Sequence, residues 1–138
     1  MKYILDTNTL SFLMRGDPLV TRQLVSRSRT DVLLPQSVVA EIEYGLSRLP
    51  RSSRRDRLRK RFDLFLGEIQ RADWSDEVSR AFGQAKADLE RRGVRIEDFD
   101  VAVAAHALAC QGRLVTDNVE HMKRVRGLEL ENWRSDLD

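Results

Sequence analysis

The segment KYILDTN occupies residues 2–8, and the segment RLVTDN occupies residues 113–118. Each begins as a short apolar run, which is typical of a buried strand. Each run closes on an aspartate, Asp6 in the first segment and Asp117 in the second. Ligands of open α/β sheets bind outside the carboxyl ends of the strands. The two predicted strands therefore point two carboxylates at one edge of a sheet, which is the layout of an acidic, metal-holding site.

Strand and helix patterns alternate along the whole chain. Strands are predicted at residues 2–6, 31–34, 69–73, 113–117 and 128–132. Helices are predicted at residues 8–15, 18–28, 37–49, 53–67, 75–92 and 99–111. This alternation predicts an α/β fold, with a mostly parallel sheet of about four to five strands covered by helices.

The composition indicates one globular domain over residues 1–138. The chain is 41% apolar and 33% charged, and it is long enough to bury a full core. We expect no contact with a membrane and a cytoplasmic location, because no apolar run reaches the roughly 18 residues of a membrane span and no signal peptide opens the chain. The single cysteine, Cys110, excludes an internal disulfide and a thiolate metal cluster.

Two further acids are placed so that they can join the first two. Glu41 lies in the helical segment SVVAEIEYGL, residues 37–46, and Asp100 opens the apolar helical segment FDVAVAAHA, residues 99–107. A carboxylate that leads into so apolar a helix is expected to be partly buried and to need a cation or donors. Asp98 is then expected to cap that helix. Four acids spread along the chain are thus available to converge.

Each acid also has a purely structural interpretation. Asp6 could cap the next helix, although Thr7, Asn8 and Thr9 offer other caps, so capping does not require it. Asp117 could be a turn residue, with Thr116 orienting it by a hydrogen bond.

Glu41 has a rival on its own helix. At about 100° per residue, Glu41 lies at the border of the apolar arc beside Gly45, and Glu43 lies at the opposite border. The spacing favours Glu41 only slightly.

The available ligands decide which cation could bind. The chain has two histidines, no HExxH motif and no cysteine pair, so a zinc site lacks nitrogen and sulfur ligands. Oxygen ligands alone suit Mg²⁺ or Mn²⁺, held singly or as a pair, and such ions promote in-line displacement at phosphorus. The sequence therefore favours a phosphodiester substrate.

Five short segments together resemble a known family. In order, they are YILDTN at 3–8, SVVAEIEYG at 37–45, DVAVAAHA at 100–107, LVTDN at 114–118 and LELENW at 128–133. These motifs cover essentially the whole chain, and in this register they resemble the PIN domain ribonucleases and, among them, the VapC toxins of bacterial toxin–antitoxin pairs.

The resemblance implies a PIN-like fold, a twisted parallel sheet flanked by helices, and endonucleolytic cleavage of RNA, with tRNA or rRNA as the substrate class. It implies that Asp6, Glu41, Asp100 and Asp117 form the catalytic site, with Asp6 and Asp100 on Mg²⁺ or Mn²⁺ and Glu41 and Asp117 acting directly or through water. Asn8, Ser37 and Thr116 lie in the same motifs and are expected to support the acids. The implied partners are a VapB-like antitoxin and a second copy of the chain, in a homodimer.

Positive charge is concentrated in residues 48–61. This stretch holds eight basic residues and one acid, a local charge of +7, whereas the rest of the chain carries 16 basic and 21 acidic residues. Leu58, Phe62, Phe65 and Ile69 form its apolar face. The opposite face could be merely solvated, or it could contact RNA or antitoxin, and these alternatives stay open for Arg54, Arg55, Arg57 and Arg59.

Other functions are less favoured. An aspartyl-phosphate enzyme would start Asp-x-Asp, and Asn8 breaks that pattern. A non-catalytic RNA- or protein-binding PIN module would not need all four acids, and an RNA-processing PIN nuclease without an antitoxin is a third alternative. Aromatic stacking on bases is the less favoured interpretation of Tyr44, Trp74 and Trp133, and His106 is expected to be a packing residue rather than a general base.

Overall fold

The computed structural model describes residues 1–135 and has an α/β fold built on one five-stranded sheet. The strands are β1 Tyr3–Leu5, β2 Val32–Pro35, β3 Gln70–Ala72, β4 Arg113–Val115 and β5 Glu129–Glu131. Their order across the sheet is β3-β2-β1-β4-β5, and every pairing is parallel. The predicted parallel sheet is thus confirmed, and β1 and β4 lie side by side at its centre.

Seven helices connect and cover the strands within the described residues. They are α1 Thr7–Met14, α2 Pro18–Val25, α3 Gln36–Arg48, α4 Ser53–Glu68, α5 Asp76–Arg91, α6 Asp98–Ala109 and α7 Val119–Met122. The six predicted helices are confirmed to within three residues at each end. The helix α7 was not predicted, because four residues are too short to show a helical period.

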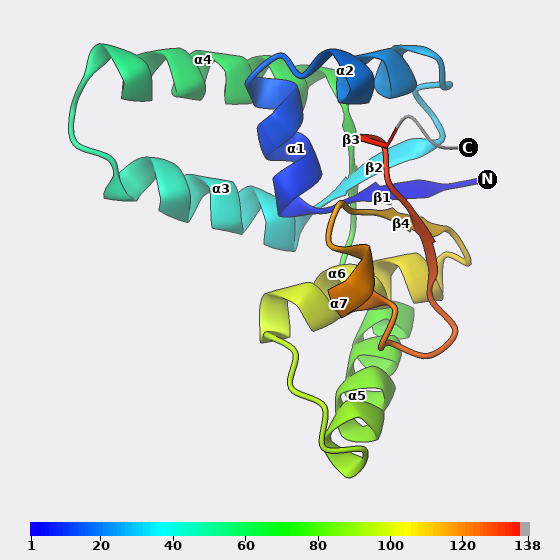
Figure 1. The fold of residues 1–138 in the computed structure, drawn as a ribbon. Coiled ribbons are helices and arrows are strands. Elements are labelled where there is room, and N and C mark those ends of the chain that lie inside the picture. Colours follow the sequence, from blue (N-terminus) through cyan, green and yellow to red (C-terminus); the bar gives the residue numbers. More distant parts are fainter. Residues whose placement is uncertain (136–138) are drawn as a thin grey trace.

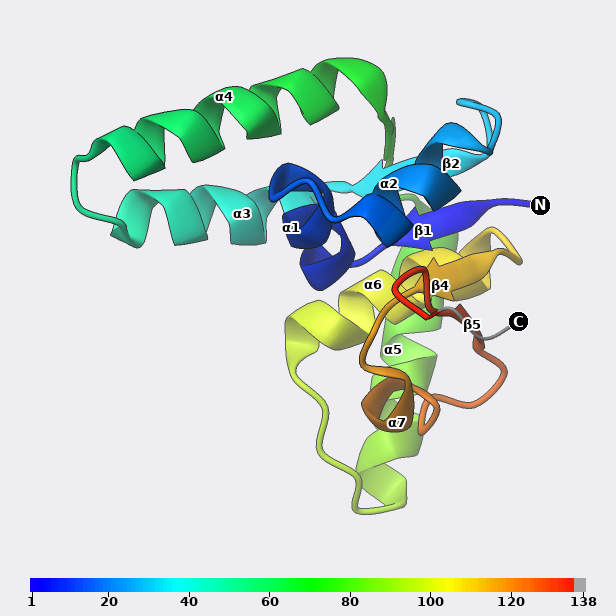
Figure 2. The ribbon, with the colours of Figure 1, turned by 45° about the horizontal axis from the view of Figure 1, so that its top comes forward.

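The helices form two layers on the sheet. Helices α5 and α6 lie on one face, and α1 and α2 lie on the other (Figures 1 and 2). Helices α3 and α4 pack as an antiparallel hairpin that extends beyond the carboxyl ends of the strands (Figure 1). The hairpin therefore stands next to the sheet edge where Asp6 and Asp117 are expected.

The turn from α6 into β4 depends on a close backbone approach. A side chain at Gly112 would place its Cβ 2.6 Å from the Lys2 carbonyl oxygen, which any larger residue would have to displace. The left-handed conformation falls on the preceding residue, Gln111, at φ 54°. Gly112 is therefore required for the close approach to β1.

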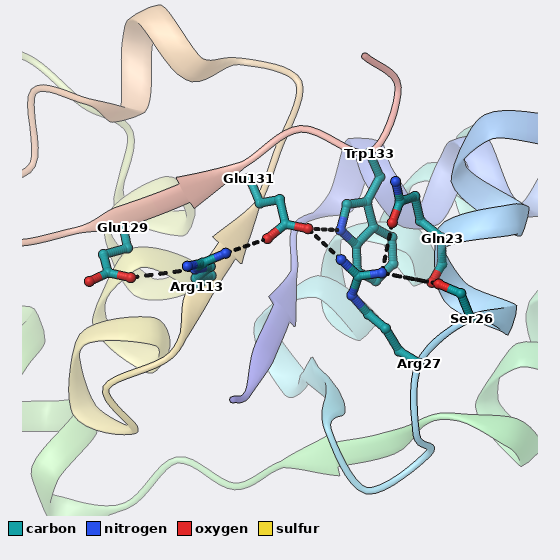
Figure 3. Close-up of polar contacts among 7 residues, drawn as sticks. All are labelled: Gln23, Ser26, Arg27, Arg113, Glu129, Glu131 and Trp133. Carbon is teal, nitrogen blue, oxygen red and sulfur yellow. Dashed lines mark hydrogen bonds and ion pairs between the residues drawn. The ribbon is translucent and has the colours of Figure 1, made fainter. Parts of the chain in front are cut away.

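A polar network fixes the last strand to helix α2 (Figure 3). The Arg27 guanidinium lies between the rings of Tyr3 and Trp133, with its carbon 4.5 and 5.0 Å from their centroids, and it pairs with Glu131 at 2.6 Å. The other carboxylate oxygen of Glu131 pairs with Arg113 at 3.0 Å. Trp133 is 1% exposed, so its predicted packing role is confirmed. The network keeps β5 on β4, the strand that leads to Asp117.

Helix α6 carries a buried histidine near its C-terminal end. His106 is 3% exposed, its ring meets the ring of Trp74 edge-on with 5.5 Å between centroids, and its Nε2 has no hydrogen-bond partner within residues 1–135. Burial lowers the pKa of His106, because the charged imidazolium would lose its hydration. This environment suits a neutral packing residue.

The lowered pKa of His106 predicts acid sensitivity. The unfolded chain takes up this proton near pH 6.5 and the folded chain only at lower pH, so stability is complete above about pH 6.5 and falls below it, by at most about 1.4 kcal/mol per pH unit. In His106→Phe, denaturant titrations between pH 5 and 6.5 should show a shallower loss of unfolding free energy. Equal slopes in both proteins would contradict this assignment.

No helix within residues 1–135 is both long and apolar enough to cross a lipid bilayer.

Candidate active site

Asp6 and Asp117 lie at the same edge of the sheet because their strands pair directly. Leu5 of β1 is in register with Val115 of β4, and the Asp6 amide donates to the Val115 carbonyl at 3.1 Å. Asp6 follows β1 at once, and Asp117 lies two residues beyond β4. The two carboxylates are close enough for the charge of Asp117 to raise the pKa of Asp6. The structure thus brings together this pair from the four predicted acids.

Asp6 is partly buried and also caps a helix. Burial is the main cause that raises its pKa, and hydrogen bonds from Thr116 and Thr9 oppose the rise. One carboxylate oxygen accepts from the Thr9 amide at 2.8 Å, which makes Asp6 the N-cap of α1. Of the possible caps in the sequence, Asp6 is thus the one that the structure uses. The second carboxylate oxygen of Asp6 does not take part in this bond to the Thr9 amide.

Glu41 reaches the site through a threonine. The Thr7 hydroxyl, next in the chain to Asp6, donates to Glu41 Oε1 at 2.6 Å. Glu43 instead pairs with Arg59 of α4, with 3.0 Å between Oε2 and Nη1. The register of α3 thus directs Glu41 toward α1 and Glu43 toward α4. Sequence reasoning had considered Thr7 only as an alternative cap.

Asp100 stands on the first turn of α6, a helix that packs against both β1 and β4. Burial raises the pKa of this half-buried carboxyl, and the nearby His121 opposes the rise. The His121 Nε2 lies 3.6 Å from Asp100 Oδ2. Sequence reasoning missed His121 as a neighbour of the site. The expected cap, Asp98, was also wrong: it is the first residue of α6 and pairs with Lys86 at 2.9 Å, while Glu97 stands at the cap.

The three supporting residues differ in what they contact. Asn8 Nδ2 donates to Asp117 Oδ1 at 3.3 Å, as a supporting residue should. The Thr116 hydroxyl accepts from the Asn118 amide at 3.0 Å and bonds to Asp6, so the expectation that it orients Asp117 was wrong. The Ser37 hydroxyl is buried, with no hydrogen-bond partner in the described part of the chain, so it supports none of the acids here.

The carboxylates of the four predicted acids are suitable ligands for a divalent cation, but not all of them lie close together. In residues 1–135, no three His, Cys, Asp or Glu side chains stand close enough together to hold a metal ion. Asp6 and Asp117 do meet, and no Lys or Arg of the described residues pairs with either of them. Asp6 is partly buried and Asp117 is exposed. Two neighbouring carboxylates without a paired base attract a cation that prefers oxygen ligands. The pair fits Mg²⁺ or Mn²⁺ in ligand chemistry, and Glu41 is linked to it through Thr7, the residue after Asp6.

A cleft leads away from these acids between α1, α3 and α4. It encloses about 410 Å³; Thr7 and Glu41 line it, as do two arginines, Arg15 and Arg54. Apolar residues line most of the remaining wall, namely Met14, Ile42, Leu46, Leu49 and Leu58. A ligand in this cleft would touch the candidate site at Glu41.

Residues 53–61 of the basic stretch belong to α4, which has one apolar face, as predicted. Phe62 and Ile69 are buried, and Leu58 and Phe65 pack against the core. Arg59 is partly neutralised by Glu43 and by Asp63, whose Oδ1 lies 3.6 Å away. Arg54, Arg55 and Arg57 make no ion pair with any described residue. Their positive charge is therefore not neutralised by an ion pair, and Arg54 places it in the wall of the cleft. Arg59 instead links α4 to α3 through Glu43.

Comparisons with known proteins cover nearly the full chain. The sequence profile of the PIN domain matches residues 3–128. "Ribonuclease VapC2" of Rickettsia felis is 31% identical over 136 residues, covering 96% of this chain and 98% of that protein. The "tRNA(fMet)-specific endonuclease VapC" of Salmonella typhimurium is 25% identical, with the same two coverages.

A solved structure agrees with these matches. The chain superimposes with a TM-score of 0.86 on a chain of the Rickettsia felis VapBC2 complex bound to a DNA fragment from its promoter. The identity is 29%, over 96% of this chain and 99% of that chain.

Proposed function

The chain belongs to the PIN domain family and, within it, to the VapC ribonucleases, and from this premise we propose that it is a Mg²⁺- or Mn²⁺-dependent endoribonuclease whose site is formed by Asp6, Glu41, Asp100 and Asp117. The observation that carries this proposal is the meeting of Asp6 and Asp117 at the carboxyl ends of two paired central strands, without a basic side chain of the described residues paired to either. The cap made by Asp6 and the hydrogen bond that Asp117 accepts from Asn8 would each be possible for an uncharged Asn, so neither role requires the two negative charges.

The chain's own residues divide the work of phosphodiester hydrolysis. Asp6 and Asp117 would hold the ion, with Asp100 completing the set from α6. When bound, the cation supplies charge neutralisation at the phosphate and a more acidic water. Glu41 accepts the Thr7 hydroxyl on Oε1, so its Oε2 is left to accept a proton from the attacking water. Water adds to phosphorus, the P–O bond to the leaving oxygen breaks, and that oxygen takes up a proton.

The partners follow from the relatives. Because the Rickettsia felis neighbour was solved as a VapBC2 complex, we propose a VapB-like antitoxin as the inhibitor of this chain. The cleft beside Glu41, with its apolar wall and Arg54, is a surface that such an inhibitor could occupy. The Salmonella typhimurium relative is specific for tRNA(fMet), which supports a structured RNA, tRNA or rRNA, as the substrate class. A homodimer and a cytoplasmic location complete the proposal.

The direct test is RNA cleavage by the purified protein. Total RNA incubated with Mg²⁺ or Mn²⁺ should give a small set of new 5′ ends, and excess EDTA should suppress them. Readdition of the ion should restore cleavage. Equal cleavage with EDTA throughout would contradict the metal site, and the absence of any cleavage with either ion would favour a non-catalytic PIN module.

A further inference from the structure

The solvent side of α3 carries an aromatic and a basic residue beyond Glu41. Tyr44 is 64% exposed, and the Arg48 guanidinium lies over its ring, 5.3 Å from the centroid. A Cβ at the neighbouring Gly45 would meet no atom of another element within 4 Å, so no other element packs against α3 at that position. The ring and the guanidinium together offer an aromatic surface and a positive charge to a ligand from solvent.

The exposure of Tyr44 sets it apart from the two tryptophans. Trp133 is buried, and Trp74 packs on Phe82 and His106. Tyr44 has no aromatic neighbour among the described residues, and the arginine covers only one face of its ring. Core or rim packing, which the sequence favoured for all three residues, therefore does not account for Tyr44.

Helical geometry aligns this pair with the candidate site. Tyr44 follows Glu41 by three residues and Arg48 follows it by seven, so all three lie on one side of α3. Along the axis, they lie about 4.5 and about 10.5 Å from Glu41, at about 1.5 Å per residue. Of the three, only Glu41 lines the cleft. Tyr44 and Arg48 lie on the adjoining, solvent-facing side of α3, which we call the lip of α3.

Free positive charge continues past Arg48 to the tip of the hairpin. Arg51 in the α3–α4 turn, and Arg54 and Arg55 at the start of α4, form no ion pair within residues 1–135. An aromatic platform followed by unpaired arginines matches a single-stranded polyanion with stackable bases. A protein partner would instead seek an apolar patch, which is offered by the cleft and not by this polar lip.

We propose that Tyr44 is a stacking platform for a base of single-stranded RNA, and that Arg48 contacts the adjoining phosphate, so that the strand leaves the site along the lip of α3. This inference rests on the proposed ribonuclease function and adds to it the path of the substrate. The base takes the ring face that Arg48 leaves open. Tyr44 and Arg48 are positioning residues, since neither reaches the acids.

The test compares Tyr44→Ala with Tyr44→Phe and with Leu64→Ala, which removes another exposed apolar side chain, on α4. Binding of an unstructured 12-nucleotide RNA, measured by fluorescence anisotropy in EDTA, should weaken about five- to 150-fold in Tyr44→Ala. Tyr44→Phe and Leu64→Ala should bind like the parent. On a cleaved RNA, Tyr44→Ala should raise KM and leave kcat nearly unchanged.

Arg48→Gln provides an independent measure. It should reduce the log-log salt slope of RNA binding by about 0.7, the value of one lost contact to single-stranded phosphate. Unchanged RNA affinity in Tyr44→Ala would overturn the inference. A change in antitoxin binding or in the oligomeric state of that variant would not rescue it. Because binding is measured without catalysis, a protein that cleaves no RNA would refute the proposed function and leave this test intact.

Discussion

Asp6→Asn is expected to abolish RNA cleavage without unfolding the protein. The substitution removes one negative charge from the pair that would hold the cation, and loss of such charge stabilisation at phosphorus amounts to several kcal/mol, or a rate loss of about 10²-fold or more. Cleavage of a mapped RNA at saturating Mg²⁺ measures the loss. Asp100→Asn should cause a similar loss from the other side of the site.

The fold should survive because asparagine caps a helix as well as aspartate does. In Asp6→Asn, the side-chain amide oxygen can still accept from the Thr9 amide, as the parent carboxylate does at 2.8 Å. The pKa of Asp6 is raised by burial and by Asp117, so stability falls as the pH rises from the unfolded-state pKa to the higher folded-state pKa, and the full cost of the charge is present above the folded-state value. We therefore expect the unfolding free energy of Asp6→Asn at pH 7, without metal, to equal or exceed that of the parent.

Asp17→Asn is the matched control. Asp17 caps α2 by accepting from the Leu19 and Val20 amides, and its pKa is lowered, first by the Val20 amide and also by Arg134. Its charge therefore stabilises the protein above the unfolded-state pKa, and this substitution should lower stability while cleavage persists. Loss of cleavage in Asp17→Asn with a folded protein, or full cleavage in Asp6→Asn, would sink the assignment.

The central sheet could be predicted because its signals are local. The apolar runs that end in Asp6 and Asp117 are visible in a few residues, and parallel pairing of their strands follows from the alternation with helices. The helix boundaries were close for the same reason. Whether Asp6 or a neighbour would cap α1 depended on side-chain geometry, because four successive residues were all good caps.

Contacts between distant segments could not be predicted. The Thr7 bond to Glu41 and the His121 contact with Asp100 join different elements, and no local period encodes them. The same holds for the metal site. Four acids can be assigned to one sheet edge from sequence, but how closely their side chains gather depends on rotamers and on the charge that the cation would neutralise.

Glu41→Gln and Glu43→Gln together test which glutamate of α3 takes part in cleavage. The two residues are two positions apart on the helix and point to different neighbours. In Glu41→Gln, the new amide oxygen can still accept from the Thr7 hydroxyl, so the local structure should hold. The amide cannot accept a proton from water or carry charge toward the ion. We expect Glu41→Gln to lose most of its cleavage activity, about 10²-fold or more in kcat.

Glu43→Gln should retain cleavage and change stability instead. Arg59 lowers the pKa of Glu43 through a hydrogen-bonded ion pair between α3 and α4. Stability from this pair is present above the unfolded-state pKa of about 4.5 and is lost as the pH falls through the lower folded-state value. Both side chains are more than a third exposed, so the loss at pH 7 should stay within about 1 kcal/mol. Because the two substitutions are chemically identical, a reversed outcome, with Glu43→Gln inactive and Glu41→Gln active, would place the working carboxylate on the opposite side of α3.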